Sequence, residues 1–320
     1  MATDGELFNE HQEGRTYHQI AQAHGLSKDS VRSRVSRYAR EQIVQLEREN
    51  RELKAQLAAR DEEDLFGHDL GKPWRLDGDW IVCGDVHLNT VKKGFMLRPL
   101  QIAERMLTGT RRLLITGDFL NADAWSDYPT IYPLPPFKRE LQAARYFFDV
   151  YLDVFDEIWV TQGNHDRRVQ KNSKNAISPE DLMRMVTHDP RIKVSHWGHA
   201  VIDSPSGEWR ATHGSEFSVQ TLSVADQLAQ KYKQHIISHH QHHCSIGWDR
   251  FKRYVIIDNG GLFDEDSLAY VMLDDNKRPR MANGFTALVG GTPYLFGASP
   301  LTNWEFWIDK QAVAESEAAA

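Results

Sequence analysis

The sequence has little cysteine and no long apolar run, and each absence excludes a class of protein. Only Cys83 and Cys244 occur among the 320 residues, which argues against a disulfide framework and fits a reducing compartment. No run reaches the roughly 18 apolar residues that a membrane helix needs, and Met1–Asp4 leads into no secretory leader. We therefore expect a cytoplasmic protein without a membrane segment.

Neither positive nor negative charge dominates the sequence, but the charged residues are unevenly distributed along it. The net charge is −7, which gives no overall affinity for nucleic acid. Between residues 15 and 40, however, Asp29 is the one acid among the cations Arg15, Lys28, Arg32, Arg34, Arg37 and Arg40. This stretch predicts a local contact with a polyanion.

Composition divides the chain into five parts. Residues 1–40 are expected to form short helices, residues 41–60 a heptad segment, and residues 61–79 a polar linker with glycines and a proline. Over residues 80–310, β-rich apolar runs alternate with helical stretches, which predicts an α/β domain. The acidic, alanine-rich residues 311–320 are predicted to fray.

The N-terminal segment has the pattern of two short helices joined by a tight turn. Thr16 and Ser27 are suited to cap the two helices, and Gly25 can adopt the positive φ that the turn requires. Their packing would come from Ile20, Ala21, Leu26, Val31 and Val35. Residues 17–31 resemble bacterial helix-turn-helix modules, which implies that the second helix binds the major groove of DNA. The side chains presented to DNA would be Lys28, Ser30, Arg32, Ser33, Arg34 and Arg37. A basic hairpin used for dimerisation or packing is the alternative.

A short heptad pattern follows. Its a and d positions are Ile43, Leu46, Asn50, Leu53 and Leu57. An Asn at an a position favours a parallel, in-register dimer, and Glu49 would face Lys54 of the partner chain. We therefore expect a homodimer through residues 43–57. Because the seam is short, packing on its own domain is the alternative.

Strands that end in polar clusters are the main feature of the remainder. The predicted strands are Trp80–Cys83, Arg112–Thr116, Glu157–Thr161, Trp209–Thr212, His235–Ser238 and Arg253–Ile257, with a helix over Gln142–Phe155. The clusters are Gly84–His87, Gly117–Asn121, Gly163–Asp166, Thr212–Gly214 and His239–His242. Strand ends are where α/β folds present catalytic residues.

The residue types in these clusters are metal ligands. Carboxylate, imidazole and amide oxygen suit Mn²⁺, Fe and Zn²⁺, whereas a thiolate site would need more cysteines. Cys83 and Cys244 are accordingly expected to be a buried thiol and an incidental neighbour. Two adjacent metals need a bridging carboxylate and can hold phosphoryl oxygens as charge develops. A single histidine is more often an ordinary interior or surface residue than a metal ligand. The prediction of a metal site therefore rests on the five clusters together, each at the end of a predicted strand.

In this order the clusters resemble the motifs of the calcineurin-like metallophosphoesterase superfamily, over about Trp80 to Asn303. The resemblance implies a four-layer α-β-β-α sandwich with two mixed sheets and two divalent ions, with Mn²⁺ expected first. It implies that Asp118 bridges the metals, that His165 is the general acid, and that Asp166 or a neighbouring group orients His165. It assigns the first metal to Asp85, His87 and His242 and the second to Asn164, His213 and His240.

The histidine cluster departs from the family pattern. His239 stands where a glycine usually precedes His-x-His, and it remains, with His243, a spare residue for indirect or substrate contacts. His196 and His199 compete with His213 as the isolated ligand. His213 is preferred because it directly follows a predicted strand.

The second and third motifs bear on the substrate class. Serine/threonine phosphoprotein phosphatases have an arginine in the second motif and Gly-Asn-His-Glu in the third. This chain has neither, so a phosphoprotein substrate is not expected. Gly-Asn-His-Asp is shared by phosphodiesterases and by exonuclease subunits of DNA double-strand-break repair complexes. Asn121 stands where many members have Asp, at a position that is usually not a direct ligand.

Two loops extend the argument about substrate. After the third motif come the cations Arg167, Arg168, Lys171 and Lys174, which suit the phosphates of a polymer or form a solvated basic loop. The aromatic-rich loop Trp125–Phe137, with Tyr128 and Tyr132, suits base stacking or covers the core.

Three hypotheses of function follow. The first is a metal-dependent DNA phosphodiesterase or nuclease, held on DNA by the N-terminal module. The second is a small-molecule phosphodiesterase or phosphatase, for example of cyclic nucleotides, whose N-terminal arm only dimerises or localises it. The third, a DNA-binding regulator with a silent metal domain, is disfavoured because every expected ligand type is present.

Overall fold

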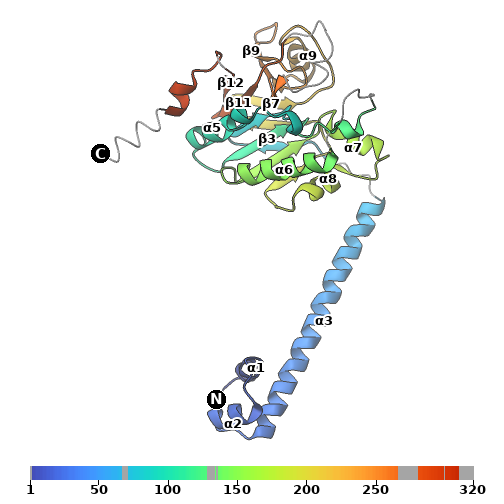
Figure 1. Ribbon diagram of the computed structural model, residues 1–320, viewed down its shortest axis with the longest axis vertical. Coiled ribbons are helices and arrows are strands. Elements are labelled where there is room, and N and C mark those ends of the chain that lie inside the picture. Colours follow the sequence, from blue (N-terminus) through green and yellow to red (C-terminus); the bar gives the residue numbers. More distant parts are fainter. Residues whose placement is uncertain are drawn as a thin grey trace, which may run out of the picture. The chain divides into compact units, whose positions relative to one another are not determined.

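The computed structural model describes residues 2–66, 71–127, 134, 136–265, 280–298 and 300–309. For residues 46, 47, 49, 50 and 52–66 it describes the backbone only. Two compact units, Met1–Asp69 and Leu70–Ala320, divide the chain, and each is described by itself (Figure 1). None of the helices in the described ranges combines the length and the apolar content needed to cross a bilayer.

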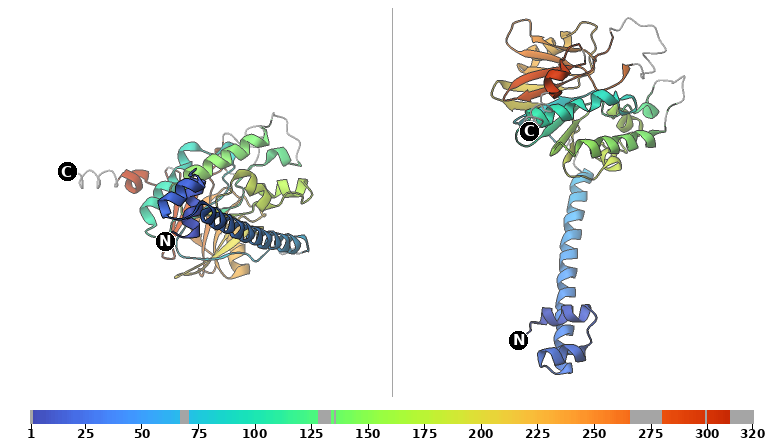
Figure 2. Two further views of the ribbon diagram at one scale, coloured as in Figure 1. Left: turned by 90° about the horizontal axis from the view of Figure 1, so that it is seen from below. Right: turned by 60° about the vertical axis from the view of Figure 1, so that its left-hand side comes forward.

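Three helices form the first unit (Figure 2): α1 (Asp4–Gln12), α2 (Tyr17–His24) and α3 (Lys28–Phe66). As predicted, Thr16 caps α2, and Gly25 ends it in a left-handed conformation with φ 64°. Ser27 Oγ accepts a hydrogen bond from the Ser30 amide at 3.1 Å. The buried core consists of Leu7, Ile20, Ala21, Val31 and Val35. Leu7 comes from α1, which lies within residues 1–40, where short helices were predicted without separate bounds for this one.

Helix α3 is longer than the sequence analysis expected. It continues through residues 41–60 and as far as Phe66, six residues into the stretch predicted as a linker. The physical reason is that no Gly or Pro interrupts residues 28–66, and the Asp and Glu residues near its end do not break a helix. Ile43 and Val44 are 55% and 61% exposed. The other predicted seam positions, and the Glu49–Lys54 pair, lie outside the described side chains.

Two six-stranded sheets form the second unit. The order of the first sheet is β1 (Arg75–Asp77), β6 (His199–Ser204), β7 (Gly207–Thr212), β8 (His235–Ser238), β10 (Val255–Asn259) and β9 (Cys244–Trp248). The order of the second is β12 (Thr292–Gly297), β11 (Gly284–Val289), β2 (Trp80–Cys83), β3 (Arg112–Thr116), β4 (Glu157–Thr161) and β5 (Ile192–Val194). Both sheets contain parallel and antiparallel pairs.

Helices cover the outer faces of the sheets. These helices are α4 (Lys93–Met96), α5 (Arg98–Met106), α6 (Phe137–Tyr151), α7 (Asp166–Asn172), α8 (Pro179–Val186) and α9 (Ser223–Tyr232). The short elements are η1 (Leu88–Thr90), η2 (Asp123–Trp125) and the π-helix η4 (Glu305–Asp309).

Strand alternation divides the core into layers. In β2, Val82 packs between the sheets while Ile81 faces the cluster formed with α5, α6 and α8. In β8, Ile237 packs between the sheets while Ile236 faces α9. The order is therefore helix, sheet, sheet, helix, and the expected pair of mixed sheets between helices is confirmed.

Several predicted boundaries differ from the structure. β1 pairs with β6 in register from Arg75 to Asp77, so these residues belong to a sheet rather than to the predicted linker. The sixth predicted strand is observed as Val255–Asn259, because Asp249 binds the amides of Arg253 and Tyr254 and keeps them in a turn. The helix predicted from Gln142 begins at Phe137. The predicted tail, residues 311–320, lies outside the described residues.

Candidate metal centre

The predicted ligands converge because their loops follow neighbouring parallel strands. β2, β3 and β4 are parallel neighbours in one sheet and deliver Asp85, Asp118 and Asn164. β7 and β8 are parallel neighbours in the other sheet, and His213 follows β7 directly. The amide of His87 donates to the Asp118 carbonyl at 3.0 Å, which joins two of these loops.

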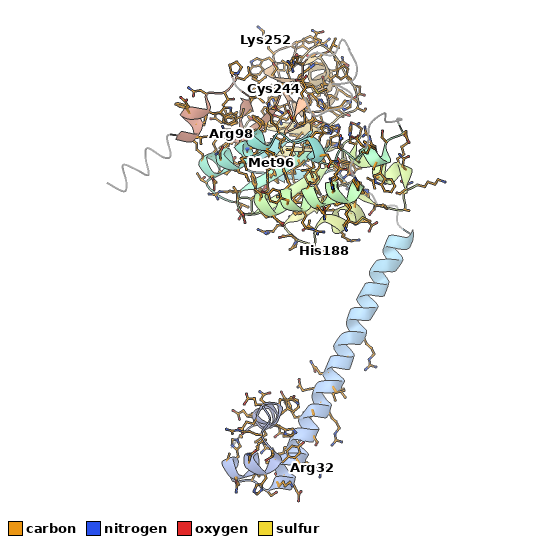
Figure 3. All side chains as sticks on the ribbon, in the orientation of Figure 1. Arg32, Met96, Arg98, His188, Cys244 and Lys252 are labelled. Carbon is orange, nitrogen blue, oxygen red and sulfur yellow. The ribbon has the colours of Figure 1, made fainter. Side chains whose placement is uncertain are left out.

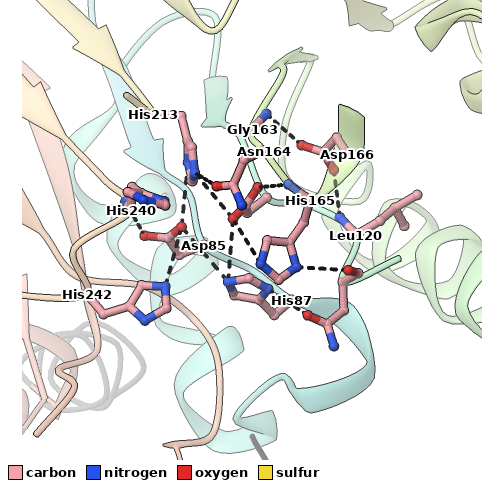
Figure 4. Close-up of polar contacts among 12 residues, drawn as sticks. Asp85, His87, Leu120, Gly163, Asn164, His165, Asp166, His213, His240 and His242 are labelled. Carbon is pink, nitrogen blue, oxygen red and sulfur yellow. Dashed lines mark hydrogen bonds and ion pairs between the residues drawn. The ribbon is translucent and has the colours of Figure 1, made fainter. Parts of the chain in front are cut away.

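Two buried carboxylates lie at the centre of the site, surrounded by imidazoles (Figure 4). Asp85 Oδ1 lies 3.6 Å from His213 Nδ1, 3.7 Å from His242 Nε2 and 4.0 Å from His87 Nε2. Asp118 Oδ2 lies 3.2 Å from His213 Nε2 and 3.9 Å from His87 Nε2. This arrangement places imidazoles around each carboxylate.

Among the described residues the potential ligand atoms form three compact groups: two follow the predicted division between two metals, and the third joins His87, Asp118 and His165. Asp85, His87 and His242 each contribute one ligand atom to a group whose atoms lie within 4.8 Å of one another. Asp118, His213 and His240 form a second such group. Asn164 Oδ1 lies 2.9 Å from His213 Nε2, on the second group. The structure thus brings together all seven residues that the sequence analysis assigned to metals.

Several of these atoms have no hydrogen-bond partner inside the protein. Asp85 Oδ1, His87 Nε2 and His213 Nδ1 are buried and unpaired among the described residues. Buried polar atoms are almost always satisfied, so unpaired carboxylate and imidazole atoms that face one another require an explanation. Divalent cations fit this donor set, which combines carboxylate oxygens and imidazole nitrogens.

The loop backbone at the site adopts unusual conformations. Non-glycine residues rarely have positive φ, yet five of the predicted ligands do: Asp85 (45°), His87 (46°), Asp118 (49°), His240 (81°) and His242 (58°). Each such residue costs on the order of 1–2 kcal/mol. The fold therefore holds these side chains in place at a cost in stability.

Burial and mutual charge set the protonation of the cluster. Burial lowers the pKa of His87 to about 3, so its ring is neutral. Burial also opposes ionisation of Asp85, but His242 and His213 lower the pKa of this carboxyl below its ordinary value. Burial disfavours the charged form of His213, yet the facing Asp118 raises its pKa to about 9. In this structure charge on His213 thus partly balances the two carboxylates.

Asn121 holds two of the functional imidazoles. Its Oδ1 accepts a hydrogen bond from His87 Nδ1 at 3.1 Å, which leaves His87 Nε2 as the nitrogen available to a metal. Its carbonyl oxygen accepts from His165 Nδ1 at 2.8 Å. The side-chain amide donates to Asp123 Oδ2 at 2.6 Å, which fixes the orientation of the Asn121 amide. The sequence analysis treated Asn121 only as a position that is usually not a ligand.

Glu140 of α6 holds Asn121 in turn. The Glu140 carboxylate is 1% exposed and accepts hydrogen bonds from the backbone amides of Asn121 and Ala122. Burial raises the pKa of Glu140 to about 7. The sequence analysis missed this residue, and no motif could have indicated it, because a glutamate at the start of an amphipathic helix is ordinarily exposed.

The surroundings of His165 correct one expectation. The Asp166 carboxylate does not orient His165: it accepts hydrogen bonds from the amides of Leu120 at 3.0 Å and Gly163 at 2.9 Å. Asp166 is the first residue of α7, and its carboxylate connects the second and third motif loops. The His165 ring is held instead by the Asn121 carbonyl and by Arg168, whose Nη2 lies 3.0 Å from His165 Nε2.

The predicted phosphate-binding cations have different surroundings. Arg168 is directed into the site, where it also pairs with Asp123 at 3.0 Å. Lys171 forms an ion pair with Asp127. Arg167 is exposed, and its guanidinium lies close to Gly198. Lys174 is exposed.

The remaining histidines near the motifs are His239 and His243, and neither belongs to a candidate ligand group among the described residues. His239 is buried, with Nδ1 2.6 Å from Thr116 Oγ1 and Nε2 3.0 Å from Asn259 Nδ2. Burial lowers the pKa of His239 to about 4, so it is a neutral interior residue. His243 is also buried, 3.5 Å from Asp258, and neither of its ring nitrogens has a hydrogen-bond partner among the described residues.

The competitors of His213 lie elsewhere. His196 pairs with Glu180 at 3.0 Å, and His199 lies against Trp197 with 5.7 Å between the ring centroids. Neither belongs to a ligand group among the described residues. Cys83 is fully buried, and burial raises the pKa of Cys244 to about 12.

The predicted DNA-facing residues divide into two sets. Arg34 and Arg37 both form ion pairs with Asp4 of α1, at 2.5 Å each. Arg34 is only partly exposed because it also donates to the Ala2 carbonyl. The rest lie further toward the start of α3: Lys28, Arg32 and Ser33 are exposed, and Ser30 is half-buried.

Most of the aromatic-rich loop lies outside the described residues, including Tyr128 and Tyr132. Its ends are described: Trp125 packs against Phe137 with 5.8 Å between ring centroids. This contact covers the core, as one of the two alternatives expected.

The chain resembles solved structures only distantly, and it matches no protein-family model and no curated protein. Among solved structures, Vps29 from Cryptosporidium parvum is 12% identical, with 69% of this chain and 96% of that chain covered and a TM-score of 0.37. The hypothetical protein PH1004 from Pyrococcus horikoshii is 9% identical, covering 74% and 93%, with a TM-score of 0.39. Vps29 from Entamoeba histolytica, solved with Zn²⁺, is 15% identical, covering 69% and 98%, with a TM-score of 0.34. Values this low establish neither a shared fold nor a shared activity.

Proposed function

We propose that the chain is a dinuclear metal-dependent phosphodiesterase that acts on DNA. One observation carries the proposal: within two groups of candidate ligands, the buried atoms Asp85 Oδ1, His87 Nε2 and His213 Nδ1 have no hydrogen-bond partner among the described residues. Asp85, His87 and His242 would hold one divalent ion, and Asn164, His213 and His240 the other, with Asp118 between them. When bound, the two ions would provide Lewis acidity and positive charge for the oxygens of a phosphoryl group. Mn²⁺ is the first candidate, with Fe and Zn²⁺ as alternatives.

The chain's own residues would orient the substrate and supply a proton. His165 donates from Nδ1 to the Asn121 carbonyl, and its Nε2 accepts from Arg168 Nη2 at 3.0 Å. For His165 to protonate a leaving oxygen, Arg168 would turn to a phosphoryl oxygen of the substrate and Nε2 would take up the proton. Asp166 supports this arrangement by fixing the amides of Leu120 and Gly163.

The case for DNA rests on the first unit. Lys28 and Arg32 are exposed at the start of α3, after a capped turn that resembles helix-turn-helix modules. We propose that Lys28, Ser30, Arg32 and Ser33 make the DNA contacts. Arg34 and Arg37 would contact DNA only if their ion pairs with Asp4 were broken.

Hydrolysis of end-labelled single- and double-stranded DNA with Mn²⁺ tests the proposal. We expect cleavage that depends on the metal and that Asp118→Ala abolishes, because this variant removes the carboxylate shared by the two groups. Lys138→Ala, a change on the surface of α6, is the control and should cleave like the wild type. DNA binding without cleavage of any DNA form would contradict the proposal.

A second candidate, a phosphodiesterase for small diesters, is favoured by the ion pairs of the basic loop. Arg168 and Lys171 are paired with Asp123 and Asp127, which reduces the charge available to a polymer. Hydrolysis of bis-p-nitrophenyl phosphate without cleavage of DNA would support this candidate.

A further inference from the structure

The hairpin between β9 and β10 exposes large apolar side chains at its tip. Trp248 is 59% exposed, Phe251 60% and Ile246 45%. β9 is the edge strand of its sheet, so within the described residues no strand pairs with its outer side. Exposed aromatic residues that lie together on a surface indicate a binding site.

The tip is rigid because one buried carboxylate holds its backbone. Asp249 is 1% exposed and accepts hydrogen bonds from the amides of Tyr254 at 2.8 Å, Phe251 at 3.3 Å and Arg253. The Gln230 side chain of α9 also donates to Asp249, which ties the tip to the helix. Trp248 and Phe251 are therefore displayed on a preorganised turn, which lowers the entropic cost of binding.

Cations surround the exposed aromatic residues. Arg250, Lys252 and Arg253 are all exposed, and Figure 3 shows Lys252 at the surface of this unit. The Arg253 guanidinium lies 4.9 Å from the Phe251 ring centroid. Arg250 is paired with Asp226 and Arg253 donates to the Gln230 side chain at 2.9 Å, so Lys252 is the cation of the described tip that is most accessible to a ligand. Asp249, the acid of this segment, is buried and faces the backbone.

The hairpin is continuous with the candidate metal centre. His242 and His243 directly precede β9. A strand rises about 3.3 Å per residue, so Trp248 lies on the order of 13 Å along β9 from Cys244. At the end of the hairpin away from the tip, Asn259 of β10 donates a hydrogen bond to the buried His239. A polymer bound at the tip would therefore lie within a few nucleotides of the metal ligands.

We propose that this hairpin tip binds single-stranded nucleic acid, and this inference rests on the proposed function. Bases stack on Trp248 and Phe251, while Lys252 and Arg253 contact the phosphates. Alternating cations and exposed aromatic rings match a polyanion that carries flat bases. Because every base has a π-face, the tip accepts any sequence and serves to hold a strand beside the metal centre.

The test is fluorescence anisotropy with the full-length chain and a fluorescein-labelled oligothymidylate, in EDTA to prevent cleavage. We expect the double variant Trp248→Ala/Phe251→Ala to bind at least about tenfold more weakly than the wild type. Tyr146→Ala, which removes an aromatic residue that is 64% exposed on α6, is the matched control and should bind like the wild type. Lys252→Glu should weaken binding and lower the salt dependence by about one phosphate contact.

Photo-cross-linking gives a readout that is specific to the tip. An oligonucleotide with 5-iododeoxyuridine should cross-link to the peptide that contains Trp248 and Phe251, as identified by mass spectrometry. If the double variant binds the oligonucleotide as tightly as the wild type, the proposal is overturned, and the apolar tip then suits a protein partner. A wild-type chain that does not bind the oligonucleotide at all overturns it as well.

Hydrolysis of bis-p-nitrophenyl phosphate with Mn²⁺ separates this inference from the proposed function. The small diester does not reach the tip, so the double variant should hydrolyse it at the wild-type rate. If the wild type hydrolyses neither the diester nor DNA, the proposed function fails, whereas the anisotropy result still decides the role of the hairpin.

Discussion

At the scale of single residues, Asn121 joins the predicted metal ligand His87 to the rest of the candidate site. Its side chain fixes one nitrogen of His87, its carbonyl fixes one nitrogen of His165, and its amide is held by Glu140. Groups that orient a ligand histidine commonly change metal affinity 10–100-fold when they are removed. The centre therefore depends on residues that would not contact a metal.

Asn121→Ala should weaken Mn²⁺ binding by on the order of 10–100-fold, because His87 loses the acceptor that fixes its tautomer. Isothermal titration calorimetry on the full chain measures the change. Asn9→Ala, at an exposed position of α1, is the matched control and should leave the affinity unchanged. Equal affinities in the two variants would show that Asn121 does not orient His87.

Glu140→Gln should remove a pH dependence of stability. Burial raises the pKa of Glu140 from 4.5 to about 7, so the folded chain retains a proton that the unfolded chain releases. The stability from this proton is fully present below about pH 4.5 and is lost as the pH rises through about 7. Urea unfolding over this range should show the wild type losing up to about 3 kcal/mol more than the variant. Parallel curves would contradict the assignment.

At the scale of elements, the loops that follow β2, β3 and β4 pack against one another so closely that glycine is required. A Cβ on Gly163 would lie 2.1 Å from Asp118 Oδ1 and 2.3 Å from the Asp118 amide. A Cβ on Gly84 would lie 2.6 Å from the Thr116 carbonyl and 2.7 Å from the His239 ring. The glycines of the motifs thus allow the approach of the loops.

Gly163→Ala should displace Asp118 and so abolish metal-dependent hydrolysis, with a loss of stability on the order of 1–3 kcal/mol. Gly94→Ala is the control, because a Cβ there has no neighbour within 4 Å. Activity assays and thermal unfolding of both variants measure the two effects. A fully active Gly163→Ala variant would contradict the close packing described above.

The sequence predicted the elements that end in ligands better than those that do not. β2, β3, β4 and β8 have their predicted bounds, because each is an apolar run followed by a polar cluster. β1, β5, β6, β9, β11 and β12 were not predicted. β1, β5, β9 and β12 are edge strands and β6 and β11 lie inside their sheets, but none of the six is followed by a cluster of predicted ligands.

The candidate site was predictable where residue identity and spacing carry the information. The residues predicted as ligands were chosen in this way, and the structure brings them together. The roles of Asn121, Glu140 and Asp166 depend on contacts between distant segments, such as Glu140 with Asn121, and spacing does not encode them.

At the scale of the whole molecule, the positive charge is local: both units are net acidic, and the cations gather between residues 15 and 40. The net charge of −7 conceals the cations at the start of α3. Since Ile43 and Val44 are exposed within the first unit, α3 has apolar surface available to a second copy. We propose that two chains pair through residues 43–57.

Ile43→Lys should shift the chain from dimer to monomer, because it places a charge at an a position of the seam. Val44→Lys is the matched control: this residue is equally exposed but lies at the neighbouring b position, outside the seam. Light scattering coupled to gel filtration measures the mass. A monomeric wild type, or a dimer that Ile43→Lys leaves intact, would contradict pairing through this helix.

The five predicted ligands with positive φ have a consequence for the evolution of this fold. Glycine would relax the backbone at each of Asp85, His87, Asp118, His240 and His242, and would remove the metal-binding side chain at the same time. A laboratory selection for thermal stability alone would therefore favour glycine at these positions. The selected variants would be more stable and would lack the predicted metal ligands. The five side chains would be retained only under selection for the proposed metal-dependent hydrolysis.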